Sequence, residues 1–169
     1  MRFAIVGCLL AGCGVTDFDI SQPVPEQRIA GSPLPGPLAG LFPIPISLDI
    51  AAKIKAMDTG PIDRVSLASL ELAITTTDEP ASDHDDWSFI SEITVYVSST
   101  ASGSTLPKVQ VAHVSNPGAT QTIAFDVDGS VNLKPYIDEG SRVDGESSGT
   151  APPDDVSYDG TGVFTVHPL

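Results

Sequence analysis

Apolar residues alternate with polar residues in many short segments of this chain, and turn-forming residues separate the segments. One such run contains Ile93, Val95 and Val97, and similar runs surround Val111 and Ile123. Successive side chains of a strand point to opposite faces, so a period of two indicates half-buried strands, whereas a helix repeats every 3.6 residues. No long amphipathic helix or internal repeat is apparent. The sequence therefore predicts an all-β fold, a single antiparallel β-sandwich of immunoglobulin-like or similar Greek-key type with about 7–9 strands.

Residues 44–56 carry the longest alternation in the chain. Every second residue from Ile44 to Ala56 is apolar, which predicts a half-buried strand. The alternative is a helix with one apolar face, formed by Ile46, Ile50, Ile54 and Met57.

Two shorter signals refine the strand prediction. The alternation that includes Val65 and Leu70 changes phase at Ala68-Ser69, which predicts a bulge inside a strand. The dipeptide Asp128-Gly129 separates two apolar runs, which predicts a β-hairpin with a type I′ turn.

Prolines are concentrated in residues 14–45, which contain seven of the fifteen in the chain. Proline lacks an N–H and favours extended conformations in the residue before it, so this segment is expected to contain no helix and no central strand. The apolar residues are denser after residue 25, where they suggest contact with a folded domain. We therefore expect a tether over residues 13–25 and a sandwich domain over residues 26–169, with an extended proline-rich part at 26–45 that lies along the domain as coil or edge strand.

Residues 1–13 have the order of a secretory signal: Arg2, an apolar run from residue 3 to residue 10, and then Ala11 and Gly12 before Cys13. As a helix, the run from residue 3 to residue 12 reaches only about 15 Å, roughly half the hydrocarbon thickness of a bilayer. Residues 1–12 are therefore predicted to be a cleaved signal peptide. The alternative is a buried apolar strand with an ordinary Cys13.

The tetrad Leu10-Ala11-Gly12-Cys13 resembles the lipobox of bacterial lipoproteins. The resemblance implies signal cleavage after Gly12 and lipidation of Cys13, with palmitate or a similar acyl group, in the bacterial cell envelope. In such lipoproteins an Asp after the Cys often retains the protein at the inner membrane, whereas Gly14 follows here. The outer membrane is therefore the expected location.

The cysteine count agrees with lipidation, because the chain contains only Cys8 and Cys13. Cleavage after Gly12 removes Cys8, so the mature chain can form no internal disulfide, and acylation protects its one thiol.

The charge of the chain excludes nucleic acid as an expected partner. Against 22 acidic residues there are 8 Lys and Arg, which gives a formal charge of −14. Binding to phosphates needs clustered positive charge. The expected partners are the membrane, through the N-terminal lipid, and a protein of the cell envelope.

The acidic loop Asp83-His84-Asp85-Asp86 contains the candidate metal ligands. Carboxylates suit calcium or magnesium, and a histidine with carboxylates can bind zinc. Adjacent residues of one loop rarely all face the same ion, so we interpret the loop as solvated and expect no metal or other cofactor. Trp87 follows this loop and is expected to be a half-buried sandwich residue; a sugar-binding rim is the alternative.

No nucleophile motif, phosphate loop or dinucleotide motif occurs, so no enzymatic activity is expected. The leading hypothesis is a lipid-anchored envelope lipoprotein whose non-catalytic sandwich has a structural or protein-interaction role. The first alternative is a carrier that binds a lipid or other apolar ligand between its sheets. The second is a carbohydrate-binding or hydrolytic module at the acidic loop.

Overall fold

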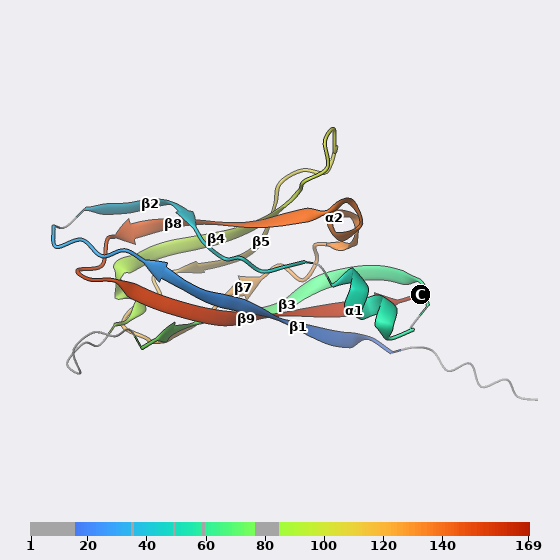
Figure 1. Ribbon diagram of the computed structural model, residues 1–169, viewed down its shortest axis with the longest axis horizontal. Helices are drawn as coiled ribbons and strands as arrows, with labels where there is room; N and C mark the ends of the chain where they lie inside the picture. Colours follow the sequence, from blue (N-terminus) through green and yellow to red (C-terminus); the bar gives the residue numbers. More distant parts are fainter. Residues whose placement is uncertain (1–15, 35, 49, 59, 77–84) are drawn as a thin grey trace, which may run out of the picture.

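The computed structural model describes residues 16–34, 36–48, 50–58, 60–76 and 85–169, and these form two antiparallel sheets packed face to face (Figure 1). The four-stranded sheet has the order β1 (Phe18–Ile29), β9 (Val156–Pro168), β3 (Ile62–Thr75) and β6 (Thr122–Ala124). The five-stranded sheet has the order β2 (Pro37–Phe42), β8 (Ser141–Thr150), β4 (Ile90–Ser99), β5 (Val109–Ser115) and β7 (Asp126–Val127). Three short helices connect them: α1 (Ala51–Ala56), η1 (Trp87–Phe89) and α2 (Lys134–Glu139). The predicted all-β sandwich is confirmed.

The core lies between the sheets and is formed by the inward-facing residues of the alternating segments. In β9, for example, Phe164 and Val166 are buried and Thr165 between them is only partly so. In β4 the buried Ile93, Val95 and Val97 repeat this period. Each large apolar side chain that is fully buried stabilises the fold by about 1.5–3 kcal/mol relative to exposure, so this pattern decides which face of each strand turns inward.

The bulge predicted at Ala68-Ser69 is confirmed. In the pairing of β3 with β9, Leu67 faces Phe164 and Ser69 faces Val163, which leaves Ala68 as the additional residue. Because of this extra residue, Leu70 is buried in the core as Leu67 is, so both halves of β3 pack on the core.

The strand predicted over residues 44–56 is wrong. Residues 44–48 are extended and buried at every second position, as the alternation requires, but they form no strand, and α1 begins at Ala51. Pro43 and Pro45 have no N–H to donate to a neighbouring strand, so a regular ladder cannot form here. The apolar side chains Ile44 and Ile46 therefore enter the core from a segment without ladder pairing.

The sandwich begins earlier than expected, because β1 starts at Phe18 and pairs with β9 along its length. Residues 18–25, expected to be tether, thus belong to an edge strand. An edge strand tolerates Pro23 and Pro25 because one side of its backbone needs no partner, and the register shifts between Val24 and Gln27. The proline-rich segment is extended as predicted. Edge strand β2 lies in the part expected to be coil or edge strand, whereas most of β1 lies in the part expected to be tether.

The hairpin predicted at Asp128-Gly129 is also wrong, because β7 ends at Val127 and a turn leads into α2. Asp128 Oδ1 accepts hydrogen bonds from the N–H and the hydroxyl of Ser130, at 2.9 and 2.5 Å, which closes a local turn. Pro135 then occupies the first turn of α2, where its missing N–H has no cost.

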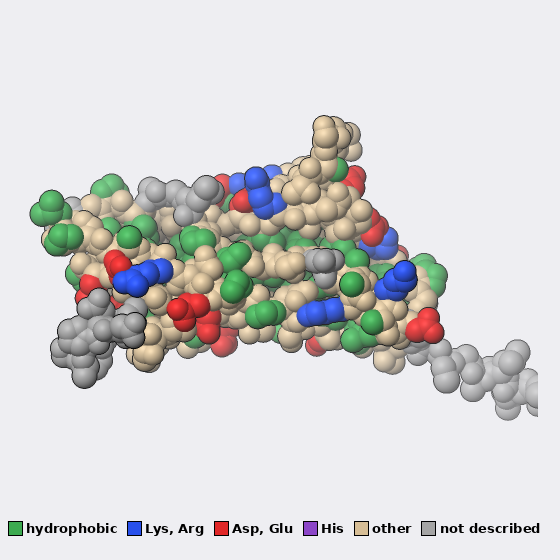
Figure 2. Space-filling model, viewed as in Figure 1, with side chains coloured by type: hydrophobic (Ala, Val, Ile, Leu, Met, Phe, Trp, Pro, Cys, Tyr) green, Lys and Arg blue, Asp and Glu red, His purple; other side chains and the backbone are tan. Residues whose placement is uncertain are grey.

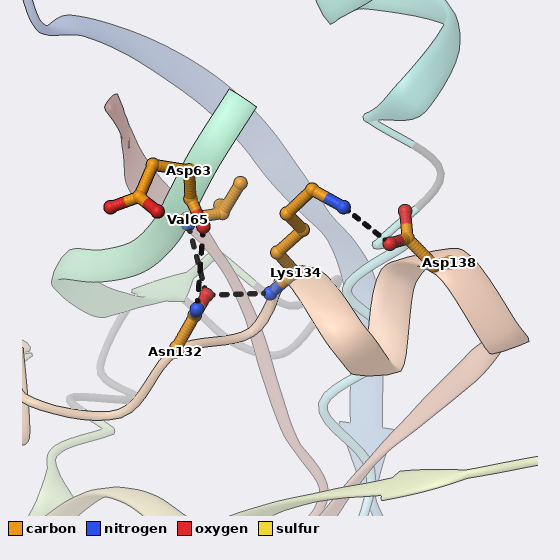
Figure 3. Close-up of polar contacts among 5 residues, drawn as sticks. All are labelled: Asp63, Val65, Asn132, Lys134 and Asp138. Carbon is orange, nitrogen blue, oxygen red and sulfur yellow. Dashed lines mark hydrogen bonds and ion pairs between the residues drawn. The ribbon is translucent and has the colours of Figure 1, made fainter. Parts of the chain in front are cut away.

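Asn132 joins this turn to β3 (Figure 3). Its Oδ1 accepts hydrogen bonds from Val65 N–H at 3.3 Å and from Lys134 N–H at 3.0 Å, and its Nδ2 donates to the Asp63 carbonyl at 3.5 Å. Lys134 forms an ion pair with Asp138 one turn later, at 2.5 Å. These contacts hold α2 at the end of the sandwich where β3 begins.

Candidate functional site

The acidic loop contains no metal cluster in its described part. Asp83 and His84 lie outside the described residues. Asp86 Oδ1 accepts a hydrogen bond from Ser88 N–H at 2.8 Å and so caps η1, which is a structural role, and Asp85 precedes it. Within residues 16–34, 36–48, 50–58, 60–76 and 85–169, no group of three or more His, Cys, Asp or Glu side chains could hold a metal ion.

A second acidic loop, at residues 154–155, is also occupied by structural contacts. Asp155 Oδ1 accepts a hydrogen bond from Gly31 N–H at 2.7 Å, and Asp155 Oδ2 lies 2.6 Å from the Arg28 guanidinium. The Gly31 N–H first, and then Arg28, lower the pKa of the Asp155 carboxyl below its ordinary value. Asp155 thus fastens the end of β1 to the start of β9.

Trp87 lies inside the core and not at a rim. It is 0% exposed and its ring lies 5.9 Å from that of Phe89 and 5.5 Å from that of Tyr158. Phe42 stacks on Tyr158 at 5.1 Å, and Trp87 Nε1 donates to the Gln121 carbonyl at 3.2 Å. The expected half-buried residue is fully buried, and the alternative of a sugar platform at Trp87 is wrong, because a platform needs an exposed ring face.

The described apolar side chains pack together between the two sheets. The void lined by Leu67, Val97 and Phe164, among others, measures about 10 Å³, which is room for one water at most. Pockets that hold small ligands measure about 300 Å³ or more. This void is therefore too small for a lipid or a similar apolar ligand.

Three polar residues that the sequence did not connect meet on the four-stranded sheet. Asp17 Oδ2 lies 2.8 Å from His167 Nδ1, and His167 Nε2 lies 3.4 Å from Ser66 Oγ. Asp17 directly precedes β1, while His167 lies in β9 and Ser66 in β3. A carboxylate, an imidazole and a hydroxyl in this order form the catalytic triad of serine hydrolases.

The surroundings of Ser66 differ from those of a catalytic serine. Ser66 is only 6% exposed, and it pairs with Thr165 within a regular part of β3, not on a tight turn that presents the hydroxyl to a substrate. None of the surface hollows described below is lined by it. We interpret the three residues as a cross-strand link that fastens Asp17, where the chain enters the sandwich, to β9 and β3.

A candidate binding surface is a groove beside the start of β8. β2 pairs with β8 only from Gly145 to Thr150, so Ser141–Asp144 have a strand partner on the β4 side alone. Two surface hollows lie along this open edge. One, of about 370 Å³, is formed by residues 42–45 and 143–145, and the other, of about 300 Å³, includes Ile46, Leu48 and Ser141. We call these two hollows together the β8 groove.

The chemistry of the β8 groove suits a peptide better than a small polar substrate. Its wider hollow is mostly apolar, with Phe42, Ile44 and Val143 in its lining. The adjacent backbone edge of β8 presents N–H and C=O groups that an extended segment can pair with. A further hollow of about 270 Å³ between His113 and Asp126 lies on the opposite edge of the same sheet.

The antiparallel β-sandwich is therefore the class that the fold defines. No protein-family model and no curated protein matches the sequence. Solved structures with some similarity include a chain from turnip yellow mosaic virus, with 15% identity and a TM-score of 0.26, covering 99% of this chain and 90% of that chain. A chain from desmodium yellow mottle tymovirus has 14% identity and a TM-score of 0.26, covering 100% and 92%. Similarity at this level says nothing about function.

The described residues contain no helix long and apolar enough to cross a bilayer. Gly12 and Cys13, with the rest of residues 1–15, lie outside the described part of the chain.

Proposed function

We propose that this protein is a lipoprotein of the bacterial cell envelope, anchored through lipidated Cys13 and carrying a non-catalytic sandwich with a structural or protein-interaction role. The observation that carries the proposal is the tetrad Leu10-Ala11-Gly12-Cys13 behind a short apolar run. The fold supports an anchor at Cys13, since the first strand, β1, begins at Phe18, a few residues further along the chain.

The proposed anchor retains the domain through apolar burial. Each acyl CH₂ group that enters the bilayer contributes about 0.8 kcal/mol, and two chains are enough for stable attachment. The outer membrane is the proposed location, because Gly14 and not Asp follows Cys13.

An interaction role is supported by the β8 groove. The open edge at Ser141–Asp144 lies beside an apolar hollow, and an extended segment of an envelope partner could add to this edge as a further strand. The void between the sheets at Leu67 and Phe164 is much smaller, at about 10 Å³.

The anchor is tested by growth with labelled palmitate followed by membrane fractionation. Wild type and Cys8→Ser are expected to carry label in the outer-membrane fraction, because Cys8 leaves with the signal peptide. Cys13→Ser is expected to carry none. Label that persists on Cys13→Ser would remove the anchoring proposal.

The interaction role is tested by co-purification from detergent-solubilised envelope. Pro45 is exposed and lines the β8 groove, so Pro45→Lys places a charge there without disturbing the core. Pro25→Lys is the matched control, because Pro25 is equally an exposed proline but lies in β1 and does not line the groove. A partner bound at the groove is expected to be lost with Pro45→Lys and kept with Pro25→Lys; equal recovery would exclude the groove as the binding surface.

A further inference from the structure

The point where the chain enters the sandwich is fixed close to the lipidation position. His167 holds Asp17 at 2.8 Å on β9, so only residues 14–16 separate Cys13 from a fastened residue. Four Cα–Cα steps, from Cys13 to Asp17, span at most about 14 Å. β9, which runs the length of the sandwich, has 13 residues and extends for about 40 Å. A lipid at Cys13 therefore keeps one particular end of the sandwich near the membrane.

That end carries α1. The helix lies beside the first part of β1, since Lys53 Nζ donates to the Ser21 carbonyl at 3.2 Å and to Gln22 Oε1 at 2.9 Å. Figure 1 places α1, the start of β1 and the C-terminus together at this end. Leu34, which follows β1, lies at the opposite end.

The surface of α1 has a composition unlike the rest of this acidic chain. From Ile50 to Met57 there is no acidic residue, and the segment holds Lys53 and Lys55, two of the seven basic residues that remain after loss of Arg2. All of α1 except Ile54 is exposed, and Met57 is 51% exposed. Figure 2 shows basic, hydrophobic and acidic side chains next to one another over this end of the molecule. We call the exposed residues Ala51, Ala52, Lys53, Lys55, Ala56 and Met57 the α1 surface.

This composition complements the surface of a membrane that contains anionic lipid. Most of the chain is repelled by such a surface, since it has 22 acidic residues. Acidic residues also lie at this end, namely Asp58 and Asp63 beyond the helix, Asp17 and Asp19 at the start of β1, and Asp138 and Glu139 on α2. The attraction is therefore confined to the α1 surface. Lysine near an anionic bilayer favours the bound state by about fivefold per residue, and an exposed methionine beside lysines adds apolar burial at the interface.

We propose that the α1 surface docks on anionic phospholipid headgroups of the membrane that holds the Cys13 lipid, so that the sandwich stands with its α1 end at the membrane and its Leu34 end away from it. This inference rests on the lipid anchor proposed above. It assigns the two lysines and Met57 a lipid-binding role that the anchor alone does not require.

The test uses the full chain, acylated in cells and reconstituted into phosphatidylcholine vesicles with or without phosphatidylglycerol. The mature acylated chain has no free thiol, so Leu169→Cys and Leu34→Cys can each be labelled at one position with a fluorophore. Both residues are exposed, at 80% and 75%, and the C-terminal Leu169 lies at the α1 end (Figure 1). With a lipid-headgroup quencher, strong quenching is expected at position 169, weak quenching at position 34, and a decrease at position 169 when phosphatidylglycerol is omitted.

Charge variants test the docking energy. Lys55→Gln in the Leu169→Cys chain is expected to lower the ratio of docked to undocked molecules by about fivefold, and Arg28→Gln, which removes one charge at the opposite end, is expected to leave it unchanged. Equal quenching at both ends, or no effect of Lys55→Gln, would overturn the docking and leave the anchor intact. A wild-type chain that reacts with the fluorophore has a free Cys13, which would overturn the anchor and the docking together.

Discussion

Replacement of Gly160 by alanine tests how closely the strands of the four-stranded sheet pack. Gly160 lies in β9 between Val24 of β1 and Leu72 of β3. A Cβ atom built at this position lies 2.2 Å from the Glu71 carbonyl oxygen and 2.6 Å from Leu72 Cδ2. The first of these atoms is backbone in a paired strand and cannot move without distorting the ladder.

The matched variant is Gly162→Ala, two positions along the same strand. Its Cβ would meet the Ile46 Cδ1 methyl group at 3.3 Å and a Phe164 ring carbon at 3.5 Å. A terminal methyl group can shift by a few tenths of an ångström, and alanine lowers the entropy of the unfolded chain, which stabilises by about 0.4–1 kcal/mol. The two effects nearly cancel, so Gly162→Ala is expected to change the free energy of unfolding by less than about 1 kcal/mol.

Gly160→Ala is expected to lower the free energy of unfolding by about 3 kcal/mol, the upper part of the range for overpacking. For a domain of this size each 1 kcal/mol shifts Tm by roughly 2–4 °C, so the expected decrease is about 6–12 °C. Urea unfolding can be followed through Trp87, the one tryptophan, which is fully buried. Equal midpoints for the two variants would refute the close approach of β9 to β3.

Three further predictions concern single hydrogen-bonding residues. Tyr158→Phe removes the 2.5 Å hydrogen bond from the buried hydroxyl to the Pro43 carbonyl and is expected to lower the free energy of unfolding by about 1–2 kcal/mol in urea titrations. Burial also raises the pKa of Tyr158, so wild type is expected to lose stability as pH rises above the unfolded tyrosine value, a loss that Tyr158→Phe should lack. Asp155→Asn should destabilise at neutral pH and have little effect in acid, because the pKa of Asp155 is lowered in the folded state and its contribution disappears as pH falls; a pH-independent effect on Tm would contradict this. Asn132→Ala leaves Val65 N–H without its acceptor and is expected to cost about 1–2 kcal/mol, whereas Asn132→Asp, which keeps an acceptor oxygen, should cost less.

The candidate sites were only partly accessible to sequence reasoning. The lipobox was found because its residues are adjacent in the chain. The link between Asp17, Ser66 and His167 was missed because its members are far apart in sequence and meet only through the pairing of β1, β9 and β3. The β8 groove was missed for a related reason, since it exists only where β2 ends and the paired part of β8 stops.

The fold, like the candidate sites, could be predicted only in part from the sequence. The alternation of apolar and polar residues predicted the strands of the sandwich, and its change of phase predicted the bulge at Ala68. Both features could be predicted because they depend on which side chains of a strand face the core. Alternation could not decide whether residues 44–48 would find a hydrogen-bonding partner, since the burial of Ile44 and Ile46 is compatible with strand or coil.

The sequence by itself determined the strand content, the inward faces and the chemical signal for an anchor at Cys13, because each depends on neighbouring residues. The tertiary structure decided the rest. It placed part of the proline-rich segment in edge strands β1 and β2, formed α1 at the end of the long alternation, and put a turn that leads into α2 at Asp128 instead of a hairpin. These outcomes depend on which strands lie beside each segment and whether its N–H groups meet an acceptor, and that is set by contacts between residues distant in the chain.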